Sequence, residues 1–322
     1  MTVPVPRVAG KTARLFAGFL AAGLLLEAAC QGLYAFGVAP PLAARRKDPL
    51  HYFEASGDPV LVYGLKPDCR IEKAGRVLRI NRQGLRDDRE NLDVSPDVAL
   101  LGDSVTFGIG LSQHETAAAA LQRLSGAEES VVNFSVPGYG LLELRRELER
   151  MLGLCRPDRI CYVLNLNDFS VRNTVFEGGD NGLYRMYAPP ALKAPFFVRK
   201  AIYRFMKGGG MSSVRWYRWL YDGNRASLLP VIREMAELAR SRGCEFDVVL
   251  FPPAAAYTDE GFVLQDVVGE IAGYLREHGI PVIAPVAEFG ADIRGLQDGT
   301  DHLTAAGSEC LARVIRKGGA SK

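Results

Sequence analysis

The chain has 322 residues, of which 48% are hydrophobic and 24% are charged, a composition typical of a globular protein rather than of a disordered chain. Its 39 basic and 37 acidic residues leave a formal net charge of +2, so the composition gives no support for a nucleic-acid partner. The six cysteines are scattered without the spacing of a zinc site, and we expect neither a metal nor an organic cofactor.

Residues 15–44 form an apolar stretch rich in Leu, Ala, Gly and Phe, in which Glu27 is the one charged residue. About 20 apolar residues suffice for a helix to cross the hydrocarbon core of a membrane. We therefore predict that residues 1–44 comprise a short cytoplasmic tip and a single transmembrane anchor, with the main domain outside the cytoplasm. Basic residues flank the stretch on both sides, so the positive-inside rule does not decide this orientation. A cleaved signal peptide, with its apolar region ending near Leu26, and a buried core helix are the alternatives.

Residues 45–96 are predicted to be an N-terminal extension with short strands at 58–63 and 76–81. From residue 97 onward, short apolar runs alternate with amphipathic segments. The predicted strands are 98–101, 131–134, 160–166, 246–251 and 281–285, and the predicted helices are 115–124, 141–154, 227–242, 263–277 and 304–316. This alternation indicates βαβ units, so we predict an α/β domain over 97–320, a three-layer α/β/α sandwich around a flavodoxin-like parallel sheet of five strands.

Residues 171–224 interrupt the alternation with glycines and many aromatic side chains. A long irregular insertion in a compact domain is usually a lid or a binding wall. Two interpretations stay open here, a helical subdomain that packs its aromatic residues inward and a lid that faces the substrate.

Polar residues follow the predicted strands where the strands end. They are Gly102-Asp103-Ser104, the run from Asn133 to Gly138, Asn165-Leu166-Asn167-Asp168 and the run from Asp298 to Thr304. In a parallel sheet, ligands bind at the carboxyl ends of the strands. The four runs together contain a serine, a histidine, carboxylates and hydrogen-bond donors, which are the groups that acyl transfer needs. Each run alone has a simpler explanation as a helix cap or a tight turn.

The order and spacing of these runs resemble the SGNH hydrolases, also called the GDSL lipase and esterase group. The resemblance covers about residues 75–315 and is carried by Gly102-Asp103-Ser104-Val105, Gly138, Asn167 and His302. The segment Asn81-Arg82-Gln83-Gly84-Leu85-Arg86-Asp87 is similar to the membrane-anchored bacterial branch of the family. Asn165 stands where the third block of the family usually has glycine.

The resemblance implies a serine hydrolase with Ser104 as nucleophile and His302 as its general base. It implies an oxyanion hole made of the backbone N–H groups of Ser104 and Gly138 and the side-chain amide of Asn167. A serine hydroxyl becomes nucleophilic when an imidazole takes its proton, and donors aimed at the oxyanion stabilise the tetrahedral intermediate.

The sequence departs from the family at the carboxylate that orients the histidine. The family places it three residues before the histidine, where this chain has Gly299. Asp298 lies four residues before His302 and Asp301 lies one before. We expect Asp298 to be the orienting carboxylate, with Asp301 as the alternative and a site without such a carboxylate as a third possibility.

The expected activity is hydrolysis of a small-molecule, carbohydrate or lipid ester through an acyl-serine intermediate on Ser104. An O-acyltransferase that modifies a cell-surface glycan would use the same residues with another acceptor, so the sequence leaves it open. A glycan-binding module that keeps the sheet without the chemistry is a further alternative. The sequence does not identify the acyl group, the alcohol or the oligomeric state.

Overall fold

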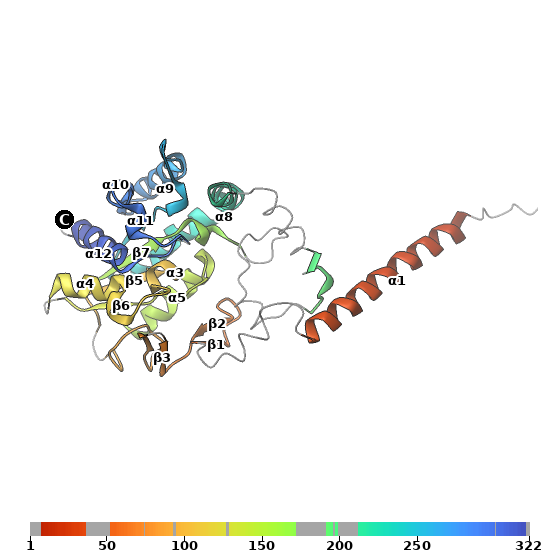
Figure 1. Cartoon of the computed structure of the whole chain (residues 1–322), viewed down its shortest axis with the longest axis horizontal. Coiled ribbons are helices and arrows are strands. Elements are labelled where there is room, and N and C mark those ends of the chain that lie inside the picture. Colours follow the sequence, from red (N-terminus) through yellow and green to blue (C-terminus); the bar gives the residue numbers. More distant parts are fainter. Residues whose placement is uncertain are drawn as a thin grey trace, which may run out of the picture. The chain divides into compact units, whose positions relative to one another are not determined.

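The computed structural model describes residues 8–36, 52–73, 75–92, 95–126, 129–171, 191–195, 197–198, 212–299 and 301–319 (Figure 1). The chain divides into two compact units. One unit comprises Met1–His51 and Gly182–Gly210, and the other comprises Tyr52–Asn181 and Met211–Lys322.

A parallel sheet of five strands forms the centre of the second unit. The strands are β5 (Val98–Gly102), β6 (Val131–Asn133), β7 (Arg159–Leu164), β8 (Glu245–Leu250) and β11 (Val282–Ile283). Their spatial order is β11-β8-β7-β5-β6, with β5 between β6 and β7. Numbered along the chain, this is the 2-1-3-4-5 order of flavodoxin-like folds, whose ligands bind where the order reverses. The predicted fold class is confirmed, and the reversal lies between β5 and β7.

Helices cover both faces of this sheet (Figure 1). The helices α4 (Ala117–Ser125), α10 (Val286–Gly290), α11 (Ile293–Leu296) and α12 (Ala305–Gly319) lie on one face. The helices α5 (Leu141–Leu154), α8 (Ser213–Ser241) and α9 (Gln265–Glu277) lie on the other. Short helical turns follow three strands: α3 (Ser104–Phe107), η2 (Leu166–Phe169) and η3 (Ala254–Ala256).

The core follows the two-residue period of the strands. Val98 and Leu100 of β5 are buried against residues of α4 and α12, such as Leu121 and Leu311. Ala99, between them, points to the opposite face, because successive side chains of a strand alternate. Every residue of β5 is buried, as expected for a central strand that is covered on both faces.

Short antiparallel pairs make up the rest of the sheet structure. They are β1 (Phe53–Ala55) with β2 (Tyr63–Leu65), β3 (Cys69–Lys73) with β4 (Arg76–Ile80), and β9 (Tyr257–Thr258) with β10 (Gly261–Phe262). A further short turn, η1 (Gln113–Glu115), precedes α4. The strand expected at 76–81 is confirmed by β4.

The strand expected at 58–63 is wrong, because this segment is mostly a turn. The side chain of Asp58 accepts hydrogen bonds from the backbone N–H of Val60 at 2.8 Å and of Leu61 at 3.2 Å. Val62 then has a φ of 60°, and the strand begins only at Tyr63. An aspartate that bonds to its own backbone favours a turn over a strand, even before a run of residues with high strand propensity.

Helix α8 begins at Ser213, well before the expected start at residue 227. The hydroxyl of Ser212 caps it by accepting from the N–H of Arg215 at 3.3 Å. Tyr217 and Tyr221, one turn apart, are buried on its inner face. The last part of the predicted insertion 171–224 is therefore helix with inward aromatic side chains. Most of the insertion, including Tyr184, Tyr187, Phe196, Tyr203 and Phe205, lies outside the described residues, so the lid remains a prediction.

The first unit contains helix α1 (Val8–Ala35), in which Thr12–Leu33 is long and apolar enough to cross a membrane. A signal sequence has the same properties. Its large apolar side chains are exposed, for example Phe19 and Leu25, which argues against the third alternative, a buried core helix. Within this unit, Glu27 accepts hydrogen bonds from the backbone N–H groups of Lys193 at 2.7 Å and Ala194 at 2.8 Å.

Candidate active site

Strand β5 and the turn after it position Ser104. Asp103 caps the short helix α3, since its carboxylate accepts a hydrogen bond from the N–H of Val105 at 2.9 Å. Gly102, the residue before Asp103, has no room for a side chain. An added Cβ would collide with Thr106 and come within 3.0 Å of the carbonyl of Val163. Ser104 is the first residue of α3 and is partly exposed at the carboxyl end of β5.

His302 lies beside this serine, although 198 positions separate the two residues in the chain. Its Nε2 is 3.1 Å from the Oγ of Ser104. This is within the heavy-atom distance over which a base can take a proton. The segment that carries His302 is tied down by Gln297, whose side chain donates to the carbonyl of Pro252 at 2.7 Å and accepts from the N–H of Ala254 at 2.8 Å.

Asp298 and His302 lie opposite each other across a tight reversal of the chain. The N–H of Asp298 donates to the carbonyl of His302 at 2.8 Å, and the N–H of Asp301 donates to the carbonyl of Asp298 at 3.2 Å. The carboxylate of Asp298 also accepts from the backbone N–H of His302 at 3.1 Å. Residues that oppose each other in this way have neighbouring side chains. The carboxylate of Asp298 therefore lies at the backbone of His302, four residues further along the chain.

The carboxylate of Asp301 is engaged elsewhere. It accepts from the hydroxyl of Tyr217 on α8 at 2.9 Å and from the N–H of Ala255 in η3 at 3.1 Å. Burial, together with the charge of Asp301, raises the pKa of Tyr217, so the phenol remains a hydrogen-bond donor. Asp301 has a φ of 65°, a left-handed conformation that Asp tolerates better than most residues. The carboxylate of Asp301 thus connects the reversal around His302 to α8 and η3.

Asn167 follows β7, the strand next to β5, and reaches the same carboxylate as the serine. Its side-chain amide donates to the Oδ2 of Asp103 at 3.0 Å, and the Oγ of Ser104 donates to that oxygen at 3.3 Å. The amide of Asn165 also points to it, at 3.4 Å. Asp103 is fully buried. A single buried carboxylate therefore connects the serine turn with the asparagine turn at the point where the strand order reverses.

Gly138 lies in the turn after β6, on the other side of β5. The chain before it runs along the end of β5, since the N–H of Val136 donates to the carbonyl of Gly102 at 3.1 Å. Gly138 is exposed and has a φ of 82°, which favours glycine at this position. The structure thus brings Ser104, Asn167 and His302 together through hydrogen bonds and places Gly138 at the same edge of the sheet.

Asp168 lies under this site in a fully buried position. Its carboxyl accepts from the hydroxyl of Tyr162 at 2.7 Å and from the N–H of Asn165 at 3.1 Å. Burial, together with the negative charge of Asp103, raises the pKa of Asp168 well above its usual range.

Three residues of the site were not singled out for it by the sequence. Tyr217 and Gln297 hold the segment of His302, and Asp103 connects Ser104 with Asn167. Tyr217 and Gln297 come from parts of the chain without a motif, so no pattern indicated them. In the described part of the chain, no cluster of three or more His, Cys, Asp or Glu residues is placed to hold a metal ion.

A comparison with protein-family models finds no match, and neither does a comparison with curated proteins. Solved structures do resemble the chain. A member of the lipolytic G-D-S-L family from Veillonella parvula is 15% identical with a TM-score of 0.44, over 68% of this chain and 96% of that one. A lipase/acylhydrolase from Enterococcus faecalis is 18% identical with a TM-score of 0.44, over 70% and 96%. An acetyl-xylooligosaccharide esterase from Geobacillus is 14% identical with a TM-score of 0.43, over 70% and 94%.

These similar structures are GDSL-type lipolytic proteins and esterases. The protein from Veillonella parvula is described as a member of the lipolytic G-D-S-L family, and the other two are described as a lipase/acylhydrolase and an esterase.

Proposed function

We propose that this chain is a serine ester hydrolase of the SGNH type, with Ser104 as nucleophile and His302 as general base. The observation that carries the proposal is the 3.1 Å distance between the Oγ of Ser104 and the Nε2 of His302. The two atoms meet at the carboxyl ends of parallel strands, where ligands bind in this fold class.

In the proposed reaction, the Oγ of Ser104 forms a bond to the carbonyl carbon of the ester while its proton moves to the Nε2 of His302. The tetrahedral intermediate collapses, the bond to the alcohol breaks, and the imidazolium gives its proton to the leaving alcohol oxygen. Water then attacks the acyl-serine in the same way, with His302 taking its proton. The carboxylic acid leaves, and Ser104 regains its proton from the imidazolium.

The oxyanion would be stabilised by the backbone N–H groups of Ser104 and Gly138 and by the amide of Asn167. The first N–H groups of a helix have no partner within the helix, which makes Ser104 at the start of α3 suited to this role. The amide of Asn167 has two hydrogens, and Asp103 accepts one of them at 3.0 Å. The second hydrogen is thereby held in a fixed direction, which is how a preorganised donor is built.

We assign the orientation of His302 to Asp298. The support is the pairing of the two residues across the reversal, with the carboxylate of Asp298 already bonded to the backbone N–H of His302 at 3.1 Å. Asp301 is less suited, because Tyr217 and Ala255 occupy its carboxylate.

The experiment that tests the proposed function is labelling of the purified chain by a fluorophosphonate, which reacts with an activated serine. We expect labelling of the wild type, and loss of labelling in Ser104→Ala and His302→Ala. Ser135→Ala is the matched control, since Ser135 is a buried serine at the same edge of the sheet and is expected to leave labelling unchanged. An unlabelled wild type would contradict the proposal and favour the glycan-binding module.

A second measurement decides whether water or a sugar accepts the acyl group. Hydrolysis of an activated acetyl ester is followed with and without sugar acceptors. If the amount of acetate released is the same with and without sugars, the result supports the hydrolase. If sugars lower the release of acetate and become acetylated themselves, the result favours the O-acyltransferase.

We further propose that residues 1–44 stay on the protein as a membrane anchor, with the domain that begins at residue 97 outside the cytoplasm. The support is Glu27, a costly residue in an apolar helix, which is bonded to the backbone of Lys193 and Ala194. Gln31, one turn later, donates to the carbonyl of Ala191 at 2.9 Å. A leader that is removed has no use for specific contacts with a distant segment. The mature N-terminus, read by mass spectrometry from the membrane fraction, tests this: cleavage before Cys30 would contradict it.

A further inference from the structure

The segment Asn81–Asp87 has no role in the proposed chemistry, yet its conformation is closely determined. The side chain of Asn81 is buried, and its Oδ1 accepts from the N–H groups of Gln83 and Leu85, both at 3.0 Å. The N–H of Asn81 donates to the carbonyl of Leu85 at 2.8 Å. Gly84 has a φ of 74°, which lets the chain close this loop. The loop holds the next residue, Arg86, in a fixed direction.

Arg86 is 2% exposed and uses its guanidinium on main-chain carbonyls. Its Nη1 donates to the carbonyls of Phe107 at 2.7 Å and Gly108 at 2.6 Å, and its Nη2 donates to that of Leu111 at 2.7 Å. Its Nε donates to the side chain of Gln113 at 3.2 Å, and the guanidinium lies 4.8 Å from the centre of the ring of Phe107.

Burying a cation costs free energy unless groups of the protein replace the hydrogen bonds that the cation made with water. Among the residues that the structure describes, no carboxylate lies close enough to Arg86 to form an ion pair, and the negative charges of Asp88 and Glu115 act on it from a greater distance. Burial lowers the pKa of Arg86 to about 10, so the side chain is still charged at neutral pH. A buried charge without an ion pair is rare, and here carbonyl groups take the place of the counterion.

The carbonyls that Arg86 binds end the helix that Ser104 begins. Helix α3 has four residues, too few to be stable by itself, and its last carbonyls have no partner within the helix. A cation at a helix C-terminus satisfies these carbonyls and interacts favourably with the helix dipole. Asp103 fixes the N-terminus of the same helix through the N–H of Val105. The helix is thus held at both ends by side chains of opposite charge.

We propose that Arg86 is a positioning residue for the nucleophile: it clamps the carbonyl end of α3 and so holds the Oγ of Ser104 within proton-transfer distance of His302. This inference rests on the proposed function. Without the guanidinium, the carbonyls of Phe107 and Leu111 lose this donor, the carbonyl of Gly108 keeps only the N–H of Leu111 at 3.2 Å, and the short helix is free to shift. A displacement of about 1 Å at a reacting atom is enough to reduce a rate about 100-fold.

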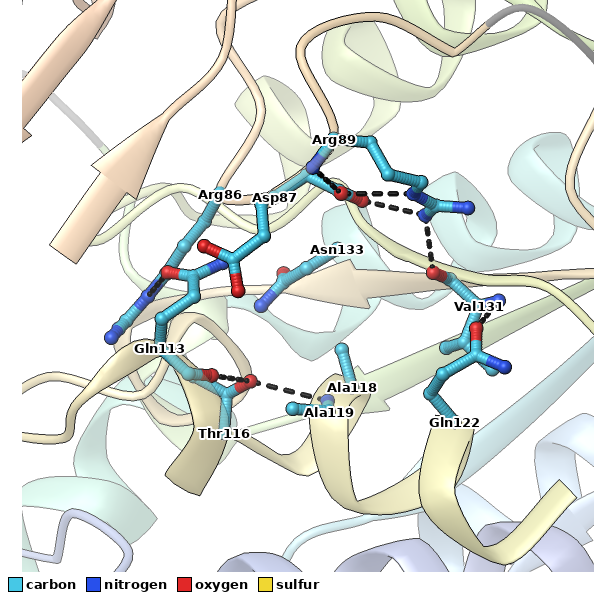
Figure 2. A pocket seen from close by; sticks show the side chains of 11 residues that line it. Arg86, Asp87, Arg89, Gln113, Thr116, Ala118, Ala119, Gln122, Val131 and Asn133 are labelled. Atoms are coloured by element: carbon cyan, nitrogen blue, oxygen red, sulfur yellow. Dashed lines mark hydrogen bonds and ion pairs between the residues drawn. The ribbon is translucent and has the colours of Figure 1, made fainter. Parts of the chain in front are cut away.

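A neighbouring arginine, Arg89, offers a control. Figure 2 shows Arg89 bonded to Asp87 and to the carbonyl of Val131, while Arg86 points in a different direction, toward Gln113. The Nη2 of Arg89 is 2.6 Å from the carboxylate of Asp87 and 2.6 Å from the carbonyl of Val131. Arg89 lies two residues beyond the segment that ends at Asp87 and is more exposed than Arg86, but its bonds are of comparable length and none of those described goes to α3.

The test uses the full chain as wild type, Arg86→Lys, Arg86→Ala and Arg89→Ala, with an activated ester as substrate and fluorophosphonate labelling as a second readout. Lys keeps the charge but lacks the planar fork that reaches three carbonyls at once. We expect kcat to fall about 10- to 100-fold in both Arg86 variants with KM changed less than about 3-fold, and labelling to slow in parallel. Arg89→Ala is expected to keep the kcat of the wild type.

Two measurements separate positioning from folding. Thermal unfolding reports whether each variant is folded at the assay temperature. Guanidinium ion at low millimolar concentration, far below denaturing levels, is expected to restore part of the kcat of Arg86→Ala and none of that of Ser104→Ala. If Arg86→Ala does not fold, Arg86→Lys carries the test.

A folded Arg86→Lys variant with the kcat of the wild type would overturn the inference, and so would an equal loss in Arg89→Ala. The proposed function fails separately, by an unlabelled wild type without esterase activity. In that case the inference falls with it.

Discussion

At the scale of single residues, the proposed site consists of side chains that are expected to react and of others that hold them. Asp103 binds both the hydroxyl of Ser104 and the amide of Asn167. Asp298 pairs with the backbone of His302. The motifs indicated the candidate reacting residues Ser104, Asn167 and His302, because the order and spacing of these motifs resemble those of one family. The sequence could not choose between Asp298 and Asp301, because that choice depends on the turn between them.

Replacing the two candidate carboxylates separates their roles. We expect Asp298→Ala to lower kcat by about 10- to 100-fold with little change in KM, because the imidazole loses its orienting partner while the serine and the oxyanion donors remain. Asp301→Asn, which keeps an oxygen for Tyr217 or Ala255, is expected to cost much less. Steady-state kinetics on an activated ester checks both. The reverse order of effects would show that Asp301 orients the histidine.

The buried carboxyl of Asp168 predicts a pH dependence of stability. Its pKa is raised in the folded chain, so above the ordinary value of about 4 the folded state binds more protons than the unfolded state. Stability therefore falls as the pH rises above that value toward the raised pKa. Asn does not titrate, so the Asp168→Asn variant is expected to lack the decrease in stability that comes from ionisation of Asp168. Its midpoint of thermal unfolding should therefore change less between pH 5 and pH 8 than that of the wild type. The exposed Asp259→Asn serves as control, and identical slopes for Asp168→Asn and the wild type would contradict the argument.

At the scale of elements, the candidate reacting residues lie at or beyond the carboxyl ends of the strands, and contacts with other elements hold them in place. The reversal around His302 is tied to α8 through Tyr217 and to the end of β8 through Gln297. The sequence predicted the strands of the parallel sheet and α5 (Leu141–Leu154) closely, since buried strands and amphipathic helices have strong periodicity. It missed the first half of α8, where aromatic residues hid the helical period.

Tyr217 provides the prediction at this scale. Tyr217→Phe removes one hydrogen bond to the carboxylate of Asp301, which we expect to lower the free energy of unfolding by about 1–2 kcal/mol. We expect kcat to fall a few-fold, because the segment of His302 loses its tie to α8. Tyr221→Phe, one turn along the same helix with its ring packed on Phe169 at 5.0 Å, is the control. Chemical denaturation and steady-state kinetics measure both effects, and equal results for the two variants would contradict the role of the Asp301 contact.

At the scale of the whole molecule, the chain combines an α/β unit with a unit that contains the apolar helix α1. All residues proposed to act on the ester belong to the α/β unit. The five-stranded sheet, the helices that cover it and the residues of the proposed site all belong to this unit. The chemistry is therefore expected to be independent of the anchor.

Deleting residues 1–44 tests this independence. We expect the shortened chain to remain in solution without detergent and to keep kcat and KM for a small water-soluble ester within about 3-fold of the full chain. Removing the exposed leucines and phenylalanines of α1 takes away the surface that requires lipid. Sedimentation and steady-state kinetics measure both properties. A shortened chain that stays soluble but is inactive would show that α1 contributes to the site.

The sequence by itself determined the fold class, the order of the elements and the four runs at the strand ends, because these depend on local periodicity and on residues adjacent in the chain. Only the tertiary structure decided which residues hold the site together. Arg86, Asp103, Tyr217 and Gln297 act through contacts with main-chain atoms or with side chains far away in the sequence. Arg86 and Asp103 belong to motifs that do not say what these residues contact, and Tyr217 and Gln297 belong to no motif, because the contact partners come together only after the chain has folded.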